Sequence, residues 1–340
     1  MHIRVALATG AILALALAQA PPPAGTLSTE IDRARTTLLA DAPEAERGSP
    51  LARLDRAKTA LDAGRLYLAT YLAEAGWEGA TNWAFIKASS DITTQEAFVK
   101  KWTATGEPRS SSRAAPVRVP VLIEALAAVA EARGPSTYHA ARPYSEDAGL
   151  FGGLYYLSDA HAVMQYAALI RGWEWPPAGT PPPLRSIADE IAAFDTEMTT
   201  AYEKMERANH STYIVASAAL KQARTLDDGA QHGGALLEYL LARYLFAPLR
   251  GPASGDATTE RIAEARKALG TAADHSIAEL FLQLAEEALA GGSDAQRRNA
   301  AAILEDVIPA YRGAIAPAAS TTTSASASQV TITLVRWPFT

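Results

Sequence analysis

Apolar side chains spaced alternately three and four residues apart are the feature that most constrains the fold of this chain. The clearest series consists of Leu184, Ile187, Ile191, Phe194, Met198, Ala201 and Met205. This spacing places one apolar stripe along a helix, with charged and hydroxyl side chains on its other faces. Because the stripe lasts only about three heptads, packing inside one bundle is favoured over a coiled coil. Alanine, the best helix former, supplies roughly a fifth of the chain, so we expect helices throughout the body.

Start and stop signals divide the body into about ten helices joined by short turns. Helix starts are predicted at Ser49-Pro50, Pro120, Asp274 and Ser293, helix ends at Gly134 and Gly291-Gly292, and a kink at Pro309. Short connections favour antiparallel neighbours. The predicted fold class is therefore all-α, either a multi-helix bundle or an array of helical hairpins.

A proline-rich segment interrupts the helical pattern near the middle of the chain. Residues 173–183 contain five prolines and are expected to form a stiff spacer instead of a helix. The spacer separates an N-terminal helical half, residues 19–172, from a C-terminal helical half, residues 184–314. The chain is long enough for one large core or two medium ones.

Residues Ala60 to Leu72 resemble the turn between the two helices of a tetratricopeptide repeat. The resemblance implies a helical hairpin and, by analogy with that family, peptide binding. The pattern does not recur at the spacing of roughly 34 residues that such repeats require. We therefore interpret this segment as a generic helix–turn–helix.

Residues 1–18 have the composition of a secretory signal peptide. Arg4 gives a positive start, an apolar run extends from Val5 to Ala18, and Pro21 follows. We expect cleavage after Ala18, because cleavage after Ala20 would place a proline first in the mature chain. The alternative is an uncleaved anchor, but the apolar run is shorter than the roughly 20 residues needed to span a bilayer. The predicted location is extracytoplasmic, in the periplasm or secreted.

Cysteine content and charge exclude several classes of protein. The chain has no cysteine, so neither a lipoprotein nor a disulfide-stabilised fold is expected. The net charge is −6, and no run of basic residues offers a surface for nucleic acid. No transmembrane segment is predicted after signal cleavage. The oligomeric state is left open by the sequence.

Catalytic and metal-binding motifs give little support to an enzyme. The chain lacks a serine-nucleophile motif and a phosphate-binding glycine pattern, so we assign no catalytic residue and no cofactor. Three histidines lie close to carboxylates in the sequence, in the pairs Glu206/His210, Asp228/His232 and Asp159/His161. Such a pair can form half of a metal site. A histidine near the C-terminal end of a helix is also stabilised by the helix dipole alone, so we assign no metal.

Aromatic residues crowd one predicted helix and the loop after it. They are Phe151, Tyr155, Tyr156, Tyr166, Trp173 and Trp175. Aromatic side chains commonly line sites for small molecules or peptides, which makes Tyr155, Tyr156, Trp173 and Trp175 our candidate binding residues. The alternative, which we favour for the helix, is that Phe151 and Tyr155 belong to the core because they lie four residues apart. Trp173 and Trp175 flank the spacer and are expected at the surface or at a hinge.

The C-terminal residues differ in kind from the body. Residues 315–329 form an Ala/Ser/Thr-rich linker, and residues 330–340 read as a β-strand. The strand residues expected to make contacts are Val330, Ile332, Leu334, Trp337 and Phe339. The strand either adds to a sheet edge of an envelope or secreted partner protein or folds back onto residues 116–121.

The predicted function follows from the missing catalytic motifs and this strand. We expect an exported helical protein that acts as a non-enzymatic protein-interaction or scaffold module. The alternative is a periplasmic small-molecule-binding protein, or a metal-dependent enzyme, that uses the aromatic and histidine-containing helices. Pull-down with chains ending at Pro317 or at Thr340 would test the role of the strand.

Overall fold

The computed structural model describes residues 23–109, 119–250 and 256–316, and within these ranges the chain is all-helical. The α-helices are α1 (Pro23–Asp41), α2 (Glu44–Asp62), α3 (Leu66–Ala88), α4 (Gln95–Thr105), α5 (Val121–Asp147), α6 (Gly149–Arg171), α7 (Ala188–Tyr202), α8 (His210–Asp228), α9 (His232–Phe246), α10 (Thr259–Leu269), α11 (Ser276–Gly291), α12 (Asp294–Ala302) and α13 (Ile308–Ile315). Short helical turns are η1 (Arg207–Asn209), η2 (Ala247–Leu249) and the π-helix η3 (Ile303–Val307). The all-α prediction is confirmed, while the signal peptide and the strand at 330–340 lie outside the described residues.

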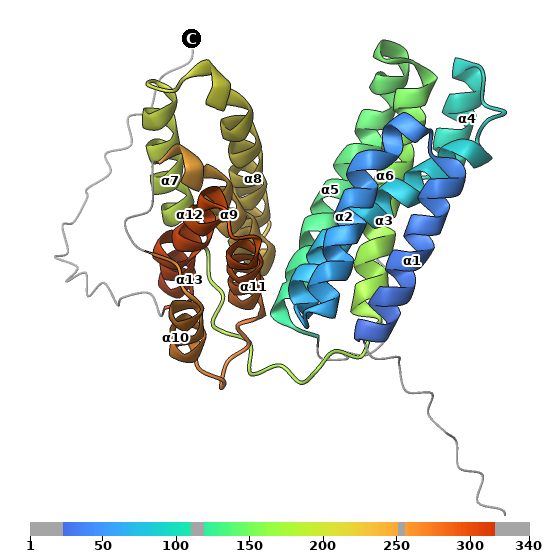
Figure 1. Cartoon of the computed structure of the whole chain (residues 1–340). Helices are drawn as coiled ribbons and strands as arrows, with labels where there is room; N and C mark the ends of the chain where they lie inside the picture. Colours follow the sequence, from blue (N-terminus) through green and yellow to red (C-terminus); the bar gives the residue numbers. More distant parts are fainter. Residues whose placement is uncertain (1–22, 110–118, 251–255, 317–340) are drawn as a thin grey trace, which may run out of the picture.

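The helices form two groups that share one core (Figure 1). The first six helices lie together, and α7 to α13 form the second group. The groups meet where α5 packs on α9 and where α3 packs on α11. The largest cluster of buried apolar side chains takes members from both groups, so no separate core divides the two halves. Among the described helices, none combines the length and apolar character needed to cross a bilayer.

The apolar stripe predicted between positions 184 and 205 is the seam of α7. Ile187, Ile191, Phe194 and Met198 are all buried. The helix begins at Ala188, later than the stripe suggests, and the backbone N–H of its N-cap residue Ile187 donates to the carboxylate of Asp227. The start predicted at Ser293 is confirmed, since Ser293 and Gln296 form a reciprocal capping box on α12.

Two predicted helix boundaries are wrong. Pro50 lies inside α2, which begins at Glu44, where Glu44 and Glu46 favour the positive end of the helix dipole. Gly134 does not end α5, which continues to Asp147 through Pro135 and Pro143. A Cβ at Gly134 would lie 2.8 Å from Cγ of Met164 on α6, so this glycine is required for close helix packing and not as a stop signal.

The spacer tryptophans are buried, which corrects the expectation that they lie at the surface or at a hinge. Trp173 and Trp175 keep 3% and 6% of their surface exposed. The indole N–H of Trp175 donates to the carbonyl of Ile170, and its ring stacks on Tyr67 at 6.0 Å. The spacer then runs against the segment before α11, where Thr180 and Ala273 form an isolated parallel β-bridge. The proline-rich segment is thus fastened to both groups of helices.

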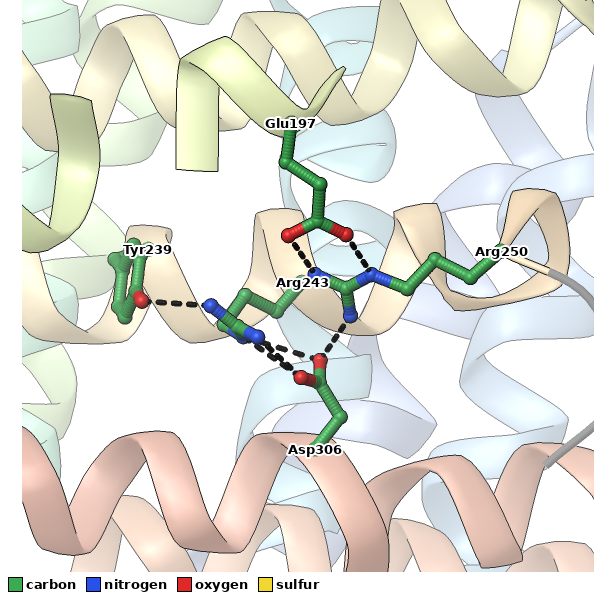
Figure 2. Close-up of polar contacts among 5 residues, drawn as sticks. All are labelled: Glu197, Tyr239, Arg243, Arg250 and Asp306. Carbon is green, nitrogen blue, oxygen red and sulfur yellow. Dashed lines mark hydrogen bonds and ion pairs between the residues drawn. The ribbon is translucent and has the colours of Figure 1, made fainter. Parts of the chain in front are cut away.

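An arginine network joins α7, α9 and the π-helix η3 (Figure 2). Arg243 and Arg250 both donate to the carboxylate of Asp306, and Nε of Arg243 lies 3.0 Å from Oδ2. Arg250 also pairs with Glu197 through two hydrogen bonds, one of 3.0 Å. Arg243 donates to the hydroxyl of Tyr239 at 2.8 Å. We call Glu197, Arg243, Arg250 and Asp306 the arginine network.

Aromatic rings complete this arrangement. The guanidinium carbons of Arg243 and Arg250 lie 4.9 Å and 5.0 Å from the ring centre of Phe194, within the range of a cation–π interaction. Asp306 reaches both arginines from η3, just before the Pro309 at which a kink was expected. A π-helical turn thus precedes Pro309, which lies in the first turn of α13.

Candidate functional site

Three polar side chains form a row along α3, in the middle of the protein. Glu74, Glu78 and Asn82 lie four residues apart, which places them on one face with a rise of about 6 Å between neighbours. The opposite face packs against α2 so closely that a Cβ at Gly76 would lie 2.5 Å from Cγ of Leu54. The close packing of α2 on that face leaves the polar row on the side of α3 that meets α6.

Arg133 of α5 and Asp159 of α6 close the row. The Nη2 atom of Arg133 donates to Oε2 of Glu78 at 2.9 Å and to Oδ2 of Asp159 at 3.0 Å. The side-chain amide of Asn82 donates to Oδ1 of Asp159 at 3.3 Å. Glu238 of α9 adds a further carboxylate, since its charge and those of Glu74 and Arg133 interact. We call these six residues the polar column: Glu74, Glu78, Asn82, Arg133, Asp159 and Glu238.

The polar column carries an excess of acidic groups. Arg133 hydrogen-bonds to two of the four carboxylates, Glu78 and Asp159, and interacts electrostatically with the other two, while Arg53 contributes a weaker attraction at Glu74. Within the described residues, Glu74 and Glu238 take part in no hydrogen bond or ion pair. The column is therefore held together by the contacts of Arg133 and Asn82, while two of its acids have no direct partner there.

Burial shifts the protonation of these carboxylates. It raises the pKa of Glu74 to about 7 and that of Glu238 to about 7, and Arg133 opposes the shift in both. Burial, together with the charge of Glu74, raises the pKa of Glu78 to about 8. For Arg133, burial acts to lower the pKa, but Glu78 and Asp159 outweigh it, so the pKa is raised and the guanidinium stays charged. The folded protein thus holds protons on acidic groups near neutral pH.

Two buried atoms of the column lack a hydrogen-bond partner among the described residues. They are Oε1 of Glu78 and Oδ1 of Asn82. Glu78 is 6% exposed and Asn82 is 0% exposed. Leaving a buried polar atom unpaired costs about 1–3 kcal/mol, so native proteins retain few of them. Both atoms sit beside the same hydrogen-bonded pair, Arg133 and Asp159.

An aromatic surface adjoins the column. Phe151, Tyr155 and Asp159 lie four residues apart on α6, and Trp83 follows Asn82 on α3. The ring centres of Trp83 and Phe151 are 5.6 Å apart, and those of Phe151 and Tyr155 are 6.5 Å apart. We call Trp83, Phe151 and Tyr155 the aromatic rim. It leads from the molecular surface, where Phe151 and Tyr155 are exposed, toward Asn82, the neighbour of Trp83 on α3.

The predicted aromatic site residues separate in the structure. Phe151 and Tyr155 are 53% and 36% exposed, so the favoured interpretation that they belong to the core is wrong. Tyr155 lies at the rim, whereas the ring of Tyr156 stacks on Tyr144 of α5 at 4.1 Å. The buried Trp173 belongs to the core away from the rim, as does Trp175. Whether any of the predicted residues binds a ligand stays a prediction.

The histidines are placed apart from the column. Nε2 of His161 lies 3.0 Å from the carbonyl of Gly106, and burial lowers its pKa. His232 pairs with Asp227 at 3.1 Å, not with Asp228, and it begins α9. His210 begins α8, so neither of these two lies at the C-terminal helix end that was expected. In the described part of the chain, no group of three or more His, Cys, Asp or Glu side chains could hold a metal ion.

Sequence reasoning missed the polar column, although one signal for it was present. The segment that forms α3 is largely apolar, and its acidic residues Glu74 and Glu78 continue in steps of four to Asn82. Polar residues at that spacing within an apolar helix indicate a polar strip that faces other helices. Asp159 was considered only as a neighbour of His161. Nothing in the local sequence links Arg133 to these residues.

Comparisons of the chain with protein-family models, with curated proteins and with solved structures gave no match. The geometry of the polar column and the aromatic rim is therefore the basis on which a function can be assigned.

Proposed function

We propose that this chain is an exported, non-enzymatic protein that binds a small organic molecule through the polar column and the aromatic rim. The observation that carries the proposal is the pair of buried, unpartnered oxygen atoms on Glu78 and Asn82. A site that binds small molecules combines apolar walls with a few convergent polar groups. The exposed rings of Phe151 and Tyr155 supply the apolar wall, and the column supplies the polar groups.

The column is reached from the surface through Arg133. Its side chain is 37% exposed, although its Nη2 atom contacts the buried carboxylate of Glu78. Arg133 thus extends from the surface to the centre of the site. A long side chain in this position can change rotamer to admit a ligand without unfolding a helix.

Binding is favoured over catalysis by the chemistry of the column. A carboxyl group with a raised pKa, such as that of Glu78, also suits a general acid. A second carboxylate, such as Asp159, would have to act as its base, but Arg133 already binds both Glu78 and Asp159. The protein-interaction role of residues 330–340 concerns residues outside the described ranges and stays a prediction.

A thermal-shift screen tests the proposal. The full chain is heated with millimolar small organic cations, neutral compounds and anions, and the hits are confirmed by calorimetry. A ligand present at 100 times its Kd should stabilise the protein by about 2.7 kcal/mol. Asn82→Leu should abolish the shift, because it removes one of the two free acceptors and leaves an apolar side chain of similar size.

Asp195→Asn is the matched control, because Asp195 forms an exposed ion pair with Arg224 on the second group of helices. This variant should retain the full shift. A screen without a single hit would refute the proposal, and so would a hit that stabilises Asn82→Leu as much as the natural sequence.

A further inference from the structure

We infer that the ligand of the proposed site is a primary ammonium compound with an apolar substituent. The ammonium group would bind Oε1 of Glu78 and Oδ1 of Asn82, and the substituent would lie on the aromatic rim. The inference rests on the proposed function and specifies the class of ligand.

Oδ1 of Asn82 is a hydrogen-bond acceptor, and Oε1 of Glu78 is one when the carboxyl group is ionised. The amide orientation of Asn82 is set by Asp159, because only the NH₂ group can donate to a carboxylate. Its oxygen must therefore face away from Asp159. In Glu78 one carboxylate oxygen is taken by Arg133, and the other is free. A group with several N–H donors and no acceptor satisfies both atoms, and an ammonium group is such a donor.

Charge supports the same ligand class. The acids Glu74, Glu78, Asp159 and Glu238 outnumber Arg133, even when the more distant Arg53 is included. When these acids are ionised, an added positive charge would reduce the negative charge of the column. The raised pKa values of Glu74, Glu78 and Glu238 agree with this, because these acids retain protons that a ligand cation can replace.

The rim specifies the other end of the ligand. Phe151 and Tyr155 leave aromatic surface exposed about two turns and one turn before Asp159 on α6, and Trp83, the neighbour of Asn82, packs on Phe151. An apolar substituent would cover this surface, which contributes about 25 cal/mol for each Å² removed from water. A bare ammonium ion or a short amine would leave the rim uncovered.

Other cations fit less well. For a divalent metal, the described residues present no group of three or more His, Cys, Asp or Glu side chains that could hold the ion. A quaternary ammonium has no N–H to donate to Asn82. A guanidinium would duplicate the position that Arg133 already occupies between Glu78 and Asp159.

Calorimetry with four probes tests this inference. The main probe is 2-phenylethylammonium, and the comparisons are 2-phenylethanol, phenylethyl-trimethylammonium and ethylammonium. We expect 2-phenylethylammonium to bind at least tenfold more tightly than each comparison. The alcohol lacks the charge, the trimethyl compound lacks the N–H donors, and ethylammonium lacks the ring.

Variants locate the two ends of the probe. Glu78→Gln should weaken 2-phenylethylammonium at least tenfold, since the amide carries no charge. Phe151→Ala should weaken it several-fold and leave ethylammonium unchanged. Because Phe151 is half-exposed, this variant is expected to fold. The four-probe comparison uses only the natural sequence, so it decides the inference even where Glu78→Gln is unstable.

The outcomes separate the inference from the function on which it rests. Equal affinity for 2-phenylethanol or for the trimethyl compound would overturn the ammonium inference and leave a small-molecule site standing. Equal affinity of Phe151→Ala for the main probe would overturn the role of the rim. Failure of all four probes together with an empty thermal-shift screen would overturn the proposed function itself.

Discussion

The arginine network and the polar column are two clusters of charged side chains in one protein, and they are built differently. In the network two guanidiniums face two carboxylates, and Arg243 and Arg250 share Asp306 between them (Figure 2). In the column one guanidinium serves four carboxylates, and two buried oxygen atoms have no partner among the described residues.

This difference indicates that the arginine network stabilises the fold and that the polar column is suited to bind a ligand. In a balanced network each charge has a partner, so the loss of one partner leaves an uncompensated charge between the helices. An unbalanced cluster lowers the stability of the fold, because some buried carboxylates must be protonated and some buried oxygens have no hydrogen bond. Proteins retain such costs mainly at functional sites. The following measurements compare the two clusters, beginning with the largest expected effect.

Removing the shared acid of the network should destabilise the fold most. Asp306→Ala leaves two guanidiniums facing each other without their common partner, and all three side chains are only about a fifth exposed. We expect a loss of about 3 kcal/mol in the free energy of unfolding, measured by urea titration. Asp195→Ala breaks an exposed pair and should cost less than about 1 kcal/mol. Equal losses of unfolding free energy in the two variants would show that the network stabilises the fold no more than an exposed ion pair does.

Changing an acid of the column should instead remove a pH-dependent cost. The unfolded chain ionises Glu78 near its ordinary pKa of 4.5, whereas the folded protein keeps the proton up to about 8. Between these values folding takes up a proton, so stability falls as the pH rises from 5 to 8. In Glu78→Gln that fall should shrink by about 2 kcal/mol, as measured by urea titration at both pH values. Glu96→Gln, at an exposed position, should keep the natural pH dependence.

The affinity for the ligand should rise with pH, whereas the stability of the free protein falls, because both depend on protons bound to the column acids. Between pH 6 and pH 8 the acids Glu74, Glu78 and Glu238 lose protons, while a primary ammonium stays charged. The affinity for 2-phenylethylammonium should therefore rise about tenfold over this range, which corresponds to about 1.4 kcal/mol. Calorimetry in two buffers of different ionisation enthalpy would also show proton release on binding. An affinity that does not change with pH would show that the ligand does not bind beside these carboxylates.

The smallest effect on stability is expected at the rim. Phe151→Ala removes an exposed ring and should change the free energy of unfolding by less than about 0.5 kcal/mol. Phe194→Ala, in the core beside the arginine network, is the matched comparison and should cost about 3–5 kcal/mol. A large loss of stability in Phe151→Ala would assign this ring to structure instead of binding.

Local sequence patterns predicted the helices well and their contacts poorly. The stripe through Ile191 and Phe194 identifies a buried helix face, because periodicity depends only on neighbouring residues. The predicted helix boundaries at Pro50 and Gly134 were wrong. Proline and glycine often mark helix ends in a sequence, but here both lie inside helices, and Gly134 allows close packing. Trp173 was expected at the surface because prolines follow it, yet its spacer docks on the body.

The candidate site depends on contacts between distant parts of the sequence. Asn82 meets Asp159 across 77 residues, and Glu78 meets Arg133 across 55. No spacing rule within a helix connects such pairs. The four-residue steps from Glu74 to Asn82 were visible in the sequence, but which helices would face them was not. The exposure of Phe151 likewise depends on which helices leave that face of α6 uncovered.

The path of α5 through Gly134 and Pro135 has a consequence for Arg133. Proline has no N–H, so the carbonyl of Glu131 cannot receive the backbone hydrogen bond that residue 135 would otherwise donate. Arg133 lies in the middle of this turn. The Arg133 side chain, which reaches Glu78 and Asp159, therefore comes from the turn of α5 that is easiest to bend. A slight change in the curvature of α5 at this turn would shift the guanidinium and leave the helical turns on either side intact.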